Sequence, residues 1–330
     1  MGWSIQSLNS VFKYLKLHST SPLKLPALGL GTSRLIHHPT KAAALRTLDI
    51  AHDLGITYYD TAPIYGFGWS EKLLGTFLQG KRDRIQIATK IGLQPSRLLT
   101  LLPFGWIVGI RKVGKTLKGQ SQKGMPVGVS RQEILSFDTE AARKSLEESL
   151  RRLKTDYVDI LLLHEATVDE ANTPEARAFM EMVLSSGKAR AIGIGSAREK
   201  LTNVRQLDAL YTVVQHDYDL CGQQQIDDGN RMVNTFGLSQ NLQCIKSMTR
   251  KNPLQEELTF ASKLDFSSEK DILSFCLAGA MYEHPGGISL FSSTQESHIR
   301  ETVTAWNSQS IDQVQFKEAI SIIRKHTQSS

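Results

Sequence analysis

The stretch Gly55-Ile-Thr-Tyr-Tyr-Asp60-Thr-Ala-Pro-Ile-Tyr65-Gly66 is the most informative part of this 330-residue chain. The apolar, β-prone residues before Asp60 predict a short buried strand. Asp60 ends that strand, a Thr-Ala-Pro turn follows, and Tyr65 stands beside a glycine. A carboxylate and a phenol at the carboxyl end of one strand are typical of an active site on a parallel α/β scaffold.

Two later strands are predicted to end on residues of the same kind. The run Ile-Gln-Ile-Ala-Thr-Lys ends at Lys90, and Val-Asp-Ile-Leu-Leu-Leu-His ends at His164. Because parallel strands of one barrel end at the same mouth, Asp60, Tyr65, Lys90 and His164 are expected to meet there. Each residue taken alone is more often structural than catalytic. Their occurrence at three strand ends favours a joint catalytic role.

Composition and charge narrow the class of protein. Hydrophobic residues make up 40% of the chain and charged residues 22%, which fits a globular protein with a substantial core. A net charge of +6 is mild for this length, so no nucleic-acid partner is predicted. Cys221, Cys244 and Cys276 are widely spaced without a Cys-x-x-Cys pair, which argues against a disulfide framework and a structural metal. Without a clear signal peptide, the predicted location is the cytoplasm.

Short apolar runs alternate with helical patterns through most of the chain. Strands are predicted at 28–32, 56–60, 85–90, 158–164, 189–196, 213–217, 242–247 and 287–291. Helices are predicted at 40–54, 70–79, 139–153, 174–186, 198–210, in the polar segment before 242, and at 270–280 and 296–306, with an extra C-terminal helix at 311–326. This alternation predicts an α/β protein, a single-domain (β/α)8 TIM barrel over residues 25–330. A doubly wound sheet is the alternative, but Gly29-Leu-Gly31-Thr-Ser-Arg34 lacks the third glycine of a dinucleotide-binding turn.

Two segments interrupt the alternation. Residues 1–24 form an N-terminal extension that is expected to pack on the body, with a membrane-surface anchor as the alternative. Residues 92–136 form a long loop after the third strand, apolar in its centre and then basic. This length favours a partly helical lid or wall beside the site, with a membrane-surface element or an oligomer contact as alternatives. The apolar run is too short to cross a bilayer, so no integral membrane segment is predicted.

The four strand-end residues suit the reduction of a carbonyl group. A free tyrosine has a pKa near 10, and a neighbouring ammonium is expected to lower the pKa of Tyr65 toward the range useful in proton transfer. Asp60 would hold the Lys90 ammonium in place, and His164 would donate a hydrogen bond to the carbonyl oxygen. No side chain can deliver a hydride, so a nicotinamide cofactor is implied.

At these residues the chain resembles the aldo-keto reductase family. The matching motifs, in order, are Gly29-Leu-Gly-Thr, Asp60-Thr-Ala-x-x-Tyr65-Gly66, Ala88-Thr-Lys90, Tyr157-Val-Asp-Ile-x-x-x-His164, Gly187-Lys-x-Arg-Ala-Ile-Gly and Val214-Gln215-x-x-Tyr218. The resemblance covers roughly residues 25–306 and is closest to bacterial and plant members acting on sugars or aryl aldehydes.

The resemblance implies an oxidoreductase that binds NADP(H), with NAD(H) as the alternative, across the carboxyl face of a TIM barrel. Tyr65 would be the proton donor, assisted by Lys90 and Asp60, with His164 orienting a small carbonyl or sugar substrate. The residues expected to contact the cofactor are Gly31, Thr32, Ser196, Gln215, Ser247, Ser292, Ser293, Thr294 and His298. A monomer or weak oligomer is expected.

The chain departs from the family pattern at cofactor positions. Gly195-Ser196 stands where a Ser-Asn pair is usual, and His298 stands at the place of an arginine, with Arg300 nearby. The loop around Ser247 also differs, and the candidate pyrophosphate contacts there are Lys246, Arg250 and Lys251. A nucleotide-sensing or catalytically reduced regulatory protein on the same barrel is therefore the alternative function. A lyase or isomerase has little support.

Overall fold

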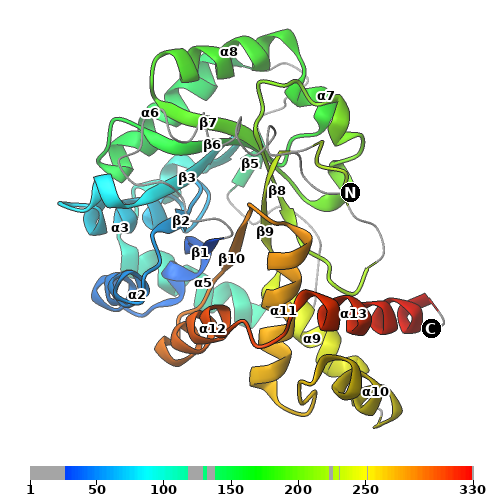
Figure 1. Cartoon of the computed structure of the whole chain (residues 1–330). Helices are drawn as coiled ribbons and strands as arrows, with labels where there is room; N and C mark the ends of the chain where they lie inside the picture. Colours follow the sequence, from blue (N-terminus) through cyan, green and yellow to red (C-terminus); the bar gives the residue numbers. More distant parts are fainter. Residues whose placement is uncertain are drawn as a thin grey trace.

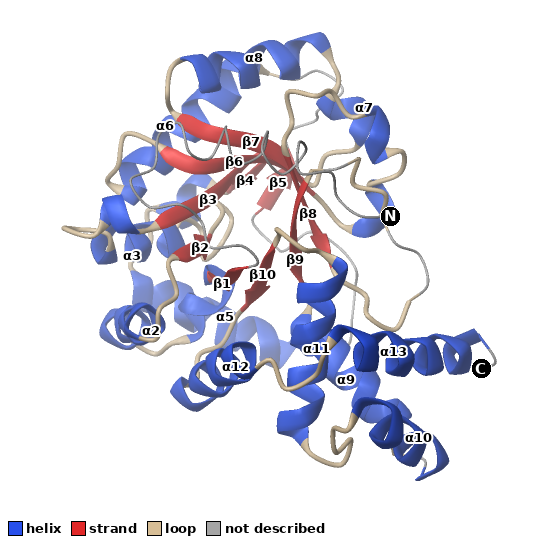
Figure 2. Ribbon diagram, in the orientation of Figure 1, coloured by secondary structure: helices blue, strands red, loops and turns tan. Residues whose placement is uncertain are grey.

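The computed structural model describes residues 27–117, 129–131, 138–222, 226–229, 231–250 and 252–328. The expected N-terminal extension, residues 1–24, lies outside this range. Eight parallel strands close into a barrel in the order β1-β10-β9-β8-β7-β6-β3-β2, with helices around it (Figure 1, Figure 2). The predicted (β/α)8 fold is therefore confirmed.

The parallel strands bring the predicted strand ends to one mouth of the barrel. The barrel strands are β1 (Ala27–Gly31), β2 (Tyr58–Asp60), β3 (Gln86–Ile91), β6 (Val158–His164), β7 (Ala189–Gly195), β8 (Val213–Asp217), β9 (Met232–Phe236) and β10 (Ile288–Phe291). Two further strands, β4 (Leu93–Pro95) and β5 (Val129–Arg131), form an antiparallel pair outside the barrel. In the barrel, Gly31 pairs with Asp60, and Gly195 pairs with both His164 and Gln215. The carboxyl ends of these strands therefore face the same mouth.

The seventh barrel strand lies earlier in the chain than expected. It is β9, whereas residues 242–247 belong to helix α9 (Leu238–Met248). Leu238, Asn241, Leu242 and Ile245 recur at helical spacing, and Asn241 and Ile245 are buried. The apolar residues at 242–247 thus belong to one face of a helix. Such a short apolar run does not by itself distinguish a helix from a strand.

Helices cover much of the barrel, but the segments after β7 and β8 differ from the prediction. The helices on the first half are η1 (Thr32–His37), α2 (Lys41–Asp53), α3 (Trp69–Phe77), η2 (Arg82–Arg84), α6 (Thr139–Leu153), α7 (Val168–Ala171) and α8 (Pro174–Ser185). After β7 the expected helix at 198–210 is replaced by two 3-10 turns, η4 (Arg198–Lys200) and η5 (Val204–Gln206). Asn203 between them has a φ of 57°, a left-handed conformation that interrupts a helix. The described residues between β8 and β9 contain no helix.

Several of the helices begin where the sequence supplies a capping side chain. Thr40 accepts a hydrogen bond from the backbone N–H of Ala43 at the start of α2, and Asp138 does the same for α6. Ser268 caps α11 (Glu269–Glu283) in the same way. The remaining helices of the second half are α10 (Asn252–Ser262), α12 (Glu296–Ser308) and the expected C-terminal helix, α13 (Gln313–Gln328).

Apolar side chains fill the interior of the barrel and the space between strands and helices. Tyr58, Ile160, Leu162 and Met232 belong to the cluster inside the barrel. A second cluster, which includes Phe316, joins α13 to α10 and α11. Because the interior is packed, a ligand can approach the strand ends only from the mouth.

The long segment after β3 is partly helical, as expected. Its described residues form β4, α4 (Arg97–Thr100), α5 (Phe104–Leu117) and β5. None of them lines the cavity described below, so a lid or wall there stays a prediction. No helix in the described ranges is long and apolar enough to cross a membrane.

Candidate active site

A buried ion pair joins two neighbouring strands at the mouth of the barrel. Lys90 Nζ donates to both carboxylate oxygens of Asp60, at 2.6 and 2.8 Å, and to the carbonyl oxygen of Thr61 at 3.0 Å. Asp60 pairs with Ala88 across β2 and β3, so Lys90, two residues further along, reaches the carboxylate. Three oxygen acceptors therefore hold one ammonium in a fixed position.

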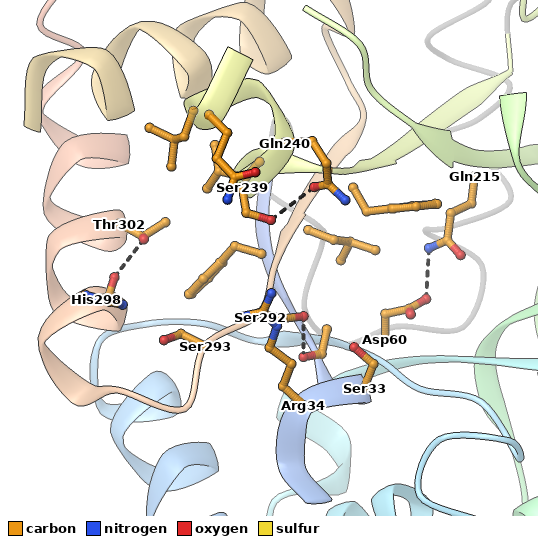
Figure 3. A pocket seen from close by; sticks show the side chains of 18 of the residues that line it. Ser33, Arg34, Asp60, Gln215, Ser239, Gln240, Ser292, Ser293, His298 and Thr302 are labelled. Carbon is orange, nitrogen blue, oxygen red and sulfur yellow. Dashed lines mark hydrogen bonds between the residues drawn. The ribbon is translucent and has the colours of Figure 1, made fainter. Parts of the chain in front are cut away.

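Gln215 reaches the same carboxylate from across the mouth. Its Nε2 donates to Asp60 Oδ2 at 2.9 Å, although β8 and β2 are not neighbours in the barrel (Figure 3). The sequence predicted that Gln215 contacts the cofactor. In the structure it lines the cavity and also orients Asp60.

Tyr65 lies half-buried in the turn after β2, beside both Lys90 and His164. Lys90 Nζ is 5.2 Å from the centroid of the Tyr65 ring, and the His164 ring centroid is 6.3 Å from it at an interplanar angle of 88°. Gly66 shapes this turn with a φ of 60°, and a Cβ there would lie 2.0 Å from Ile36 Cγ2. The structure thus brings all four predicted catalytic side chains together.

The pKa of Tyr65 is raised above its ordinary value of 10. Burial is the largest cause of the rise and Asp60 adds to it, whereas the charge and hydrogen bond of Lys90 act in the opposite direction. The predicted lowering of this pKa is therefore wrong, because removing the phenol from water outweighs the nearby ammonium. Tyr65 keeps its proton at neutral pH.

Lys90 is charged and His164 is neutral at the same mouth. Burial by itself would lower the pKa of Lys90, but the attraction and hydrogen bonds of Asp60 and Tyr65 raise it overall. Burial, followed by the charges of Lys90 and Lys200, lowers the pKa of His164 well below 6.5. A neutral imidazole carries one N–H donor and one acceptor. Its Nδ1 has no hydrogen-bond partner among the described residues.

The four side chains line a cavity of about 1060 Å³. Figure 3 shows Asp60 and Gln215 on one side of it and His298 and Thr302 on the other. The cavity therefore extends from the strand ends to α12. Six of the nine residues expected to contact the cofactor line it: Gly31, Ser196, Gln215, Ser292, Ser293 and His298.

Thr32, Ser247 and Thr294 do not line the cavity. Thr32 is fully buried, and its hydroxyl donates to the carbonyl oxygen of Asp60 at 3.0 Å, so it supports the strand end from behind. Ser247 is exposed on α9, and its hydroxyl donates to the carbonyl oxygen of Cys244 at 2.7 Å. The prediction for Ser247 failed because it depended on the misplaced seventh strand.

Two of the serine hydroxyls that line the cavity already donate to the backbone. Ser196 Oγ donates to the carbonyl oxygen of Ala166 at 2.6 Å, and Ser292 Oγ donates to that of Gly31 at 2.8 Å. Each hydroxyl has one proton, so these oxygens are left to accept hydrogen bonds. They suit an amide N–H of a ligand, whereas a phosphate needs donors from elsewhere.

A basic rim that the sequence analysis did not assemble supplies such donors. Arg34 on η1, Lys246 on α9 and Lys270 on α11 line the cavity. Lys246 pairs with Glu269 at 2.6 Å, while no ion pair of Arg34 or Lys270 occurs within the described ranges. Of the three, only Lys246 was among the residues suggested by the sequence. Arg34 lies three residues after the end of β1, and this position near a strand end could have identified it from the sequence.

The start of α9 adds backbone donors to this rim. Gly237 precedes the helix with a φ of 110°, and residues 237–240 line the cavity. The first N–H groups of a helix have no partners within it and attract anions. If the seventh strand had been predicted at 232–236, the sequence would have indicated a helix that begins after Gly237. Arg300, considered as a phosphate ligand, instead pairs with Glu296 at 2.7 Å outside the lining.

The arrangement combines a proton donor, a fixed positive charge, a neutral imidazole and a cavity with a basic rim. It suits transfer of a proton to an oxygen atom next to a bound anionic ligand. Within the described ranges, no group of three His, Cys, Asp or Glu side chains is placed to hold a metal ion.

Comparison with known proteins places the chain among oxidoreductases of one family. The model of the Aldo/keto reductase family matches residues 27–324. The chain is 36% identical over 209 residues to D-threo-aldose 1-dehydrogenase of a Pseudomonas species, covering 61% of this chain and 60% of that protein. It is 33% identical over 151 residues to pyridoxal 4-dehydrogenase of Microbacterium luteolum, covering 43% and 40%. The chain thus spans three fifths or less of the length of these relatives.

Solved structures share the fold at low identity. The holo form of an aldo-keto reductase from Bacillus halodurans superposes with a TM-score of 0.64 at 21% identity, covering 93% of this chain and 94% of that one. An aldo-keto reductase from Klebsiella pneumoniae in complex with NADPH gives 0.60 at 18%, covering 91% of each chain.

Proposed function

Because the chain belongs to the aldo/keto reductase family, we propose that it transfers a hydride between NADP(H) and a small aldehyde, ketone or sugar, with Tyr65 as the proton donor. The observation that carries this proposal is the meeting of Tyr65, Lys90, Asp60 and His164 at the mouth of a large cavity. Carbonyl reduction is the simplest chemistry that explains why a barrel of this family carries this set of side chains.

The residues of the cavity fit a nicotinamide dinucleotide. Gln215 and Ser196 lie at the catalytic end and offer amide and hydroxyl groups to a carboxamide. Arg34, Lys270 and the first turn of α9 offer donors to phosphate groups. When bound, the nicotinamide supplies the hydride, which no side chain can deliver.

The side chains of the mouth then manage the proton. Tyr65 holds its proton at neutral pH and can release it to a substrate oxygen that gains negative charge. The phenolate left behind lies next to the Lys90 ammonium, which Asp60 keeps in place. Neutral His164 can donate an N–H to the same substrate oxygen without adding a competing charge. In the direction of alcohol oxidation the same proton returns to Tyr65.

The preference between NADP(H) and NAD(H) depends on the far end of the cavity. His298, an exposed side chain, stands where the family has an arginine, and Arg300 is engaged by Glu296. Among the described residues, Arg34 is the arginine that lines the cavity. Figure 3 shows its side chain near Ser292. We propose NADP(H) as the cofactor, with Arg34 in place of the missing arginine as the source of positive charge.

The first experiment separates nucleotide binding from turnover. The protein is titrated with NADPH and with NADH by fluorescence, and reduction of 4-nitrobenzaldehyde and oxidation of aldoses are followed by absorbance. Tyr65→Phe is expected to lower kcat by about 10²- to 10⁴-fold, the usual contribution of a general acid, with nucleotide affinity unchanged. Unimpaired turnover in Tyr65→Phe would remove the proton donor from the proposal. Tight nucleotide binding without turnover of any substrate would instead support the nucleotide-sensing alternative.

We place this reaction in the cytoplasm. Cys221, Cys244 and Cys276 are all free thiols, although Cys221 and Cys244 lie close enough to share a hydrogen bond. Free thiols at this proximity are in keeping with a reducing compartment.

A further inference from the structure

One carboxylate lines the cavity directly beside the candidate catalytic residues. Glu165 follows His164 at the end of β6, and its half-buried side chain forms part of the cavity wall. Burial is the main cause of the raised pKa of Tyr65, and the charge of Glu165 adds to the rise, so this carboxylate acts on the phenol electrostatically. The proton transfer proposed for Tyr65, Lys90 and His164 does not use Glu165. Its place in the wall therefore needs another explanation.

The backbone of Glu165 is held in an unfavourable conformation. Its φ of 60° lies in the left-handed region, which residues with a Cβ seldom adopt. Its N–H donates to the carbonyl oxygen of Gly195 at 2.7 Å, and the carbonyl oxygen of Ala166 accepts from Ser196 Oγ at 2.6 Å. The end of β7 and the residue after it thus fix the turn on both sides of Glu165. Backbone outliers that are fixed in this way are concentrated at binding and catalytic sites.

Lys200 holds the side chain of Glu165 from outside the cavity. Its Nζ donates to Glu165 Oε2 at 2.7 Å and to the backbone carbonyl oxygen of Glu165 at 3.3 Å. Lys200, at the end of η4, does not line the cavity. A ligand in the cavity therefore meets the carboxylate of this pair and not the ammonium. A carboxylate offers about four lone-pair positions, so an ion pair and a ligand can share it.

Two other carboxylates of the cavity wall are arranged differently. Asp60 pairs with Lys90 at the strand ends, and both side chains line the cavity. Glu269 pairs with Lys246 at the basic rim, and both of these line it as well. Each of these pairs presents opposite charges to a ligand. Glu165 differs because its cation lies behind the wall, so it gives the catalytic end of the cavity a negatively charged hydrogen-bond acceptor.

We propose that Glu165 selects the substrate: it accepts hydrogen bonds from the hydroxyl groups of a neutral polyhydroxy aldehyde or aldose, and it repels carbonyl compounds that carry a carboxylate. This inference rests on the proposed function, since it takes the carbonyl carbon to react beside Tyr65 and His164. Hydroxyl groups on the neighbouring carbons of the substrate then lie within reach of the next residue in the wall. An anionic substrate would bring a second negative charge against Glu165, which is costly where water is largely excluded.

The first test compares substrates that differ in charge or in hydroxyl groups. 4-Nitrobenzaldehyde and 4-carboxybenzaldehyde have similar shapes and differ in charge, whereas D-glyceraldehyde and propanal differ in two hydroxyl groups. In Glu165→Gln, kcat/KM for 4-carboxybenzaldehyde relative to 4-nitrobenzaldehyde is expected to rise at least about tenfold. The preference for D-glyceraldehyde over propanal is expected to fall by about the same factor, with NADPH affinity unchanged. Unchanged ratios in Glu165→Gln would overturn the proposal.

Two further variants separate selection from a purely structural role. Lys200→Met removes the cation behind the wall and leaves the carboxylate, so the ratio for 4-carboxybenzaldehyde is expected to fall, opposite to its change in Glu165→Gln. An ion pair that only held the turn would shift the ratio in the same direction in both variants, and that result would contradict the proposal. Glu199→Gln is the matched control, because Glu199 is exposed on the same turn, does not line the cavity, and is expected to leave both ratios unchanged.

A binding measurement gives an answer that does not depend on turnover. Saturation-transfer NMR of the full-length protein with NADP⁺ compares D-galactose with D-galacturonate. The wild type is expected to bind D-galactose at least about tenfold more tightly, and Glu165→Gln is expected to remove most of this difference. A wild type that reduces no carbonyl compound but shows this difference would refute the proposed function and still support the role of Glu165. Equal binding of the two sugars by the wild type would overturn that role.

Discussion

Asp60 receives hydrogen bonds from two side chains, one on the neighbouring strand β3 and one on β8 across the barrel mouth. Lys90 binds both of its oxygens and Gln215 binds one of them, while the hydroxyl of Thr32 holds its backbone carbonyl. These contacts explain how a carboxylate and an ammonium remain paired where water is largely excluded. A buried pair of this kind stabilises the fold only while both partners are present.

Replacing Lys90 by Met should therefore affect stability as well as activity. The change leaves the Asp60 carboxylate buried with Gln215 as its remaining side-chain donor among the described residues, and is expected to cost about 3–5 kcal/mol. The double variant D60N/K90M removes both charges and should recover part of that loss, while neither variant reduces aldehydes efficiently. Urea denaturation measures both. A double variant no more stable than K90M would show that the loss does not come from an unpaired Asp60.

At the scale of elements, the packing of α3 on α6 supports the strand that carries Lys90. Glu71 of α3 is fully buried, accepts a hydrogen bond from Arg152 Nε of α6 at 2.6 Å, and accepts another from Thr89 Oγ1 at 2.8 Å. Thr89 directly precedes Lys90 in β3. The close approach of the helices occurs at Gly75, where a Cβ would lie 2.3 Å from the carbonyl oxygen of Arg152.

Gly75→Ala is expected to destabilise the protein by about 1–3 kcal/mol, because the added methyl group meets rigid backbone. Gly109→Ala in α5 is the matched control: nothing lies within 4 Å of its added Cβ, and its φ is not positive. It is expected to be neutral or to stabilise by up to about 1 kcal/mol, the helix preference of Ala over Gly. Thermal unfolding of the two variants compares them directly. Equal effects would show that packing at Gly75 is looser than these distances imply.

At the scale of the whole molecule, several buried histidines couple stability to pH. Burial is the main reason why the pKa values of His164, His216 and His284 lie below 6.5, and that of His284 falls to about 3. In the unfolded chain these side chains take up protons near pH 6.5, while the folded protein resists doing so. The stability that they provide is therefore present above pH 6.5 and is lost as the pH falls below it.

The free energy of unfolding is expected to fall between pH 7.5 and pH 5.5, by up to about 1.4 kcal/mol for each such histidine per pH unit below 6.5. H216N/H284N removes two neighbouring rings, with centroids 5.7 Å apart, and should make this dependence shallower whatever its effect on absolute stability. Replacement of the exposed His298 by Asn is the matched surface control. Urea denaturation at several pH values gives the slopes, and identical slopes for all three proteins would contradict this assignment.

The barrel and the meeting of the four candidate side chains at its mouth were predictable from local sequence patterns. Asp60, Lys90 and His164 each end a short apolar run, and parallel strands must bring such ends to one mouth. This inference needs no knowledge of side-chain packing, because strand direction alone places the residues. Helix α12 was likewise identified near its observed bounds, since its apolar residues recur at helical spacing.

Tertiary structure alone decided which groups face each other and in which protonation state. The apolar residues at 242–247 fit a strand or a helix, and only packing selects the helix, so Ser247 lies away from the cavity. Gln215 meets Asp60 across the mouth, a contact between strands that are not neighbours. The pKa of Tyr65 depends on how much water the folded chain excludes, a quantity that no run of residues encodes locally. The sequence by itself therefore determined the chemical groups and their common mouth, while the closed barrel set their contacts and charges, because these depend on distances between segments far apart in the chain.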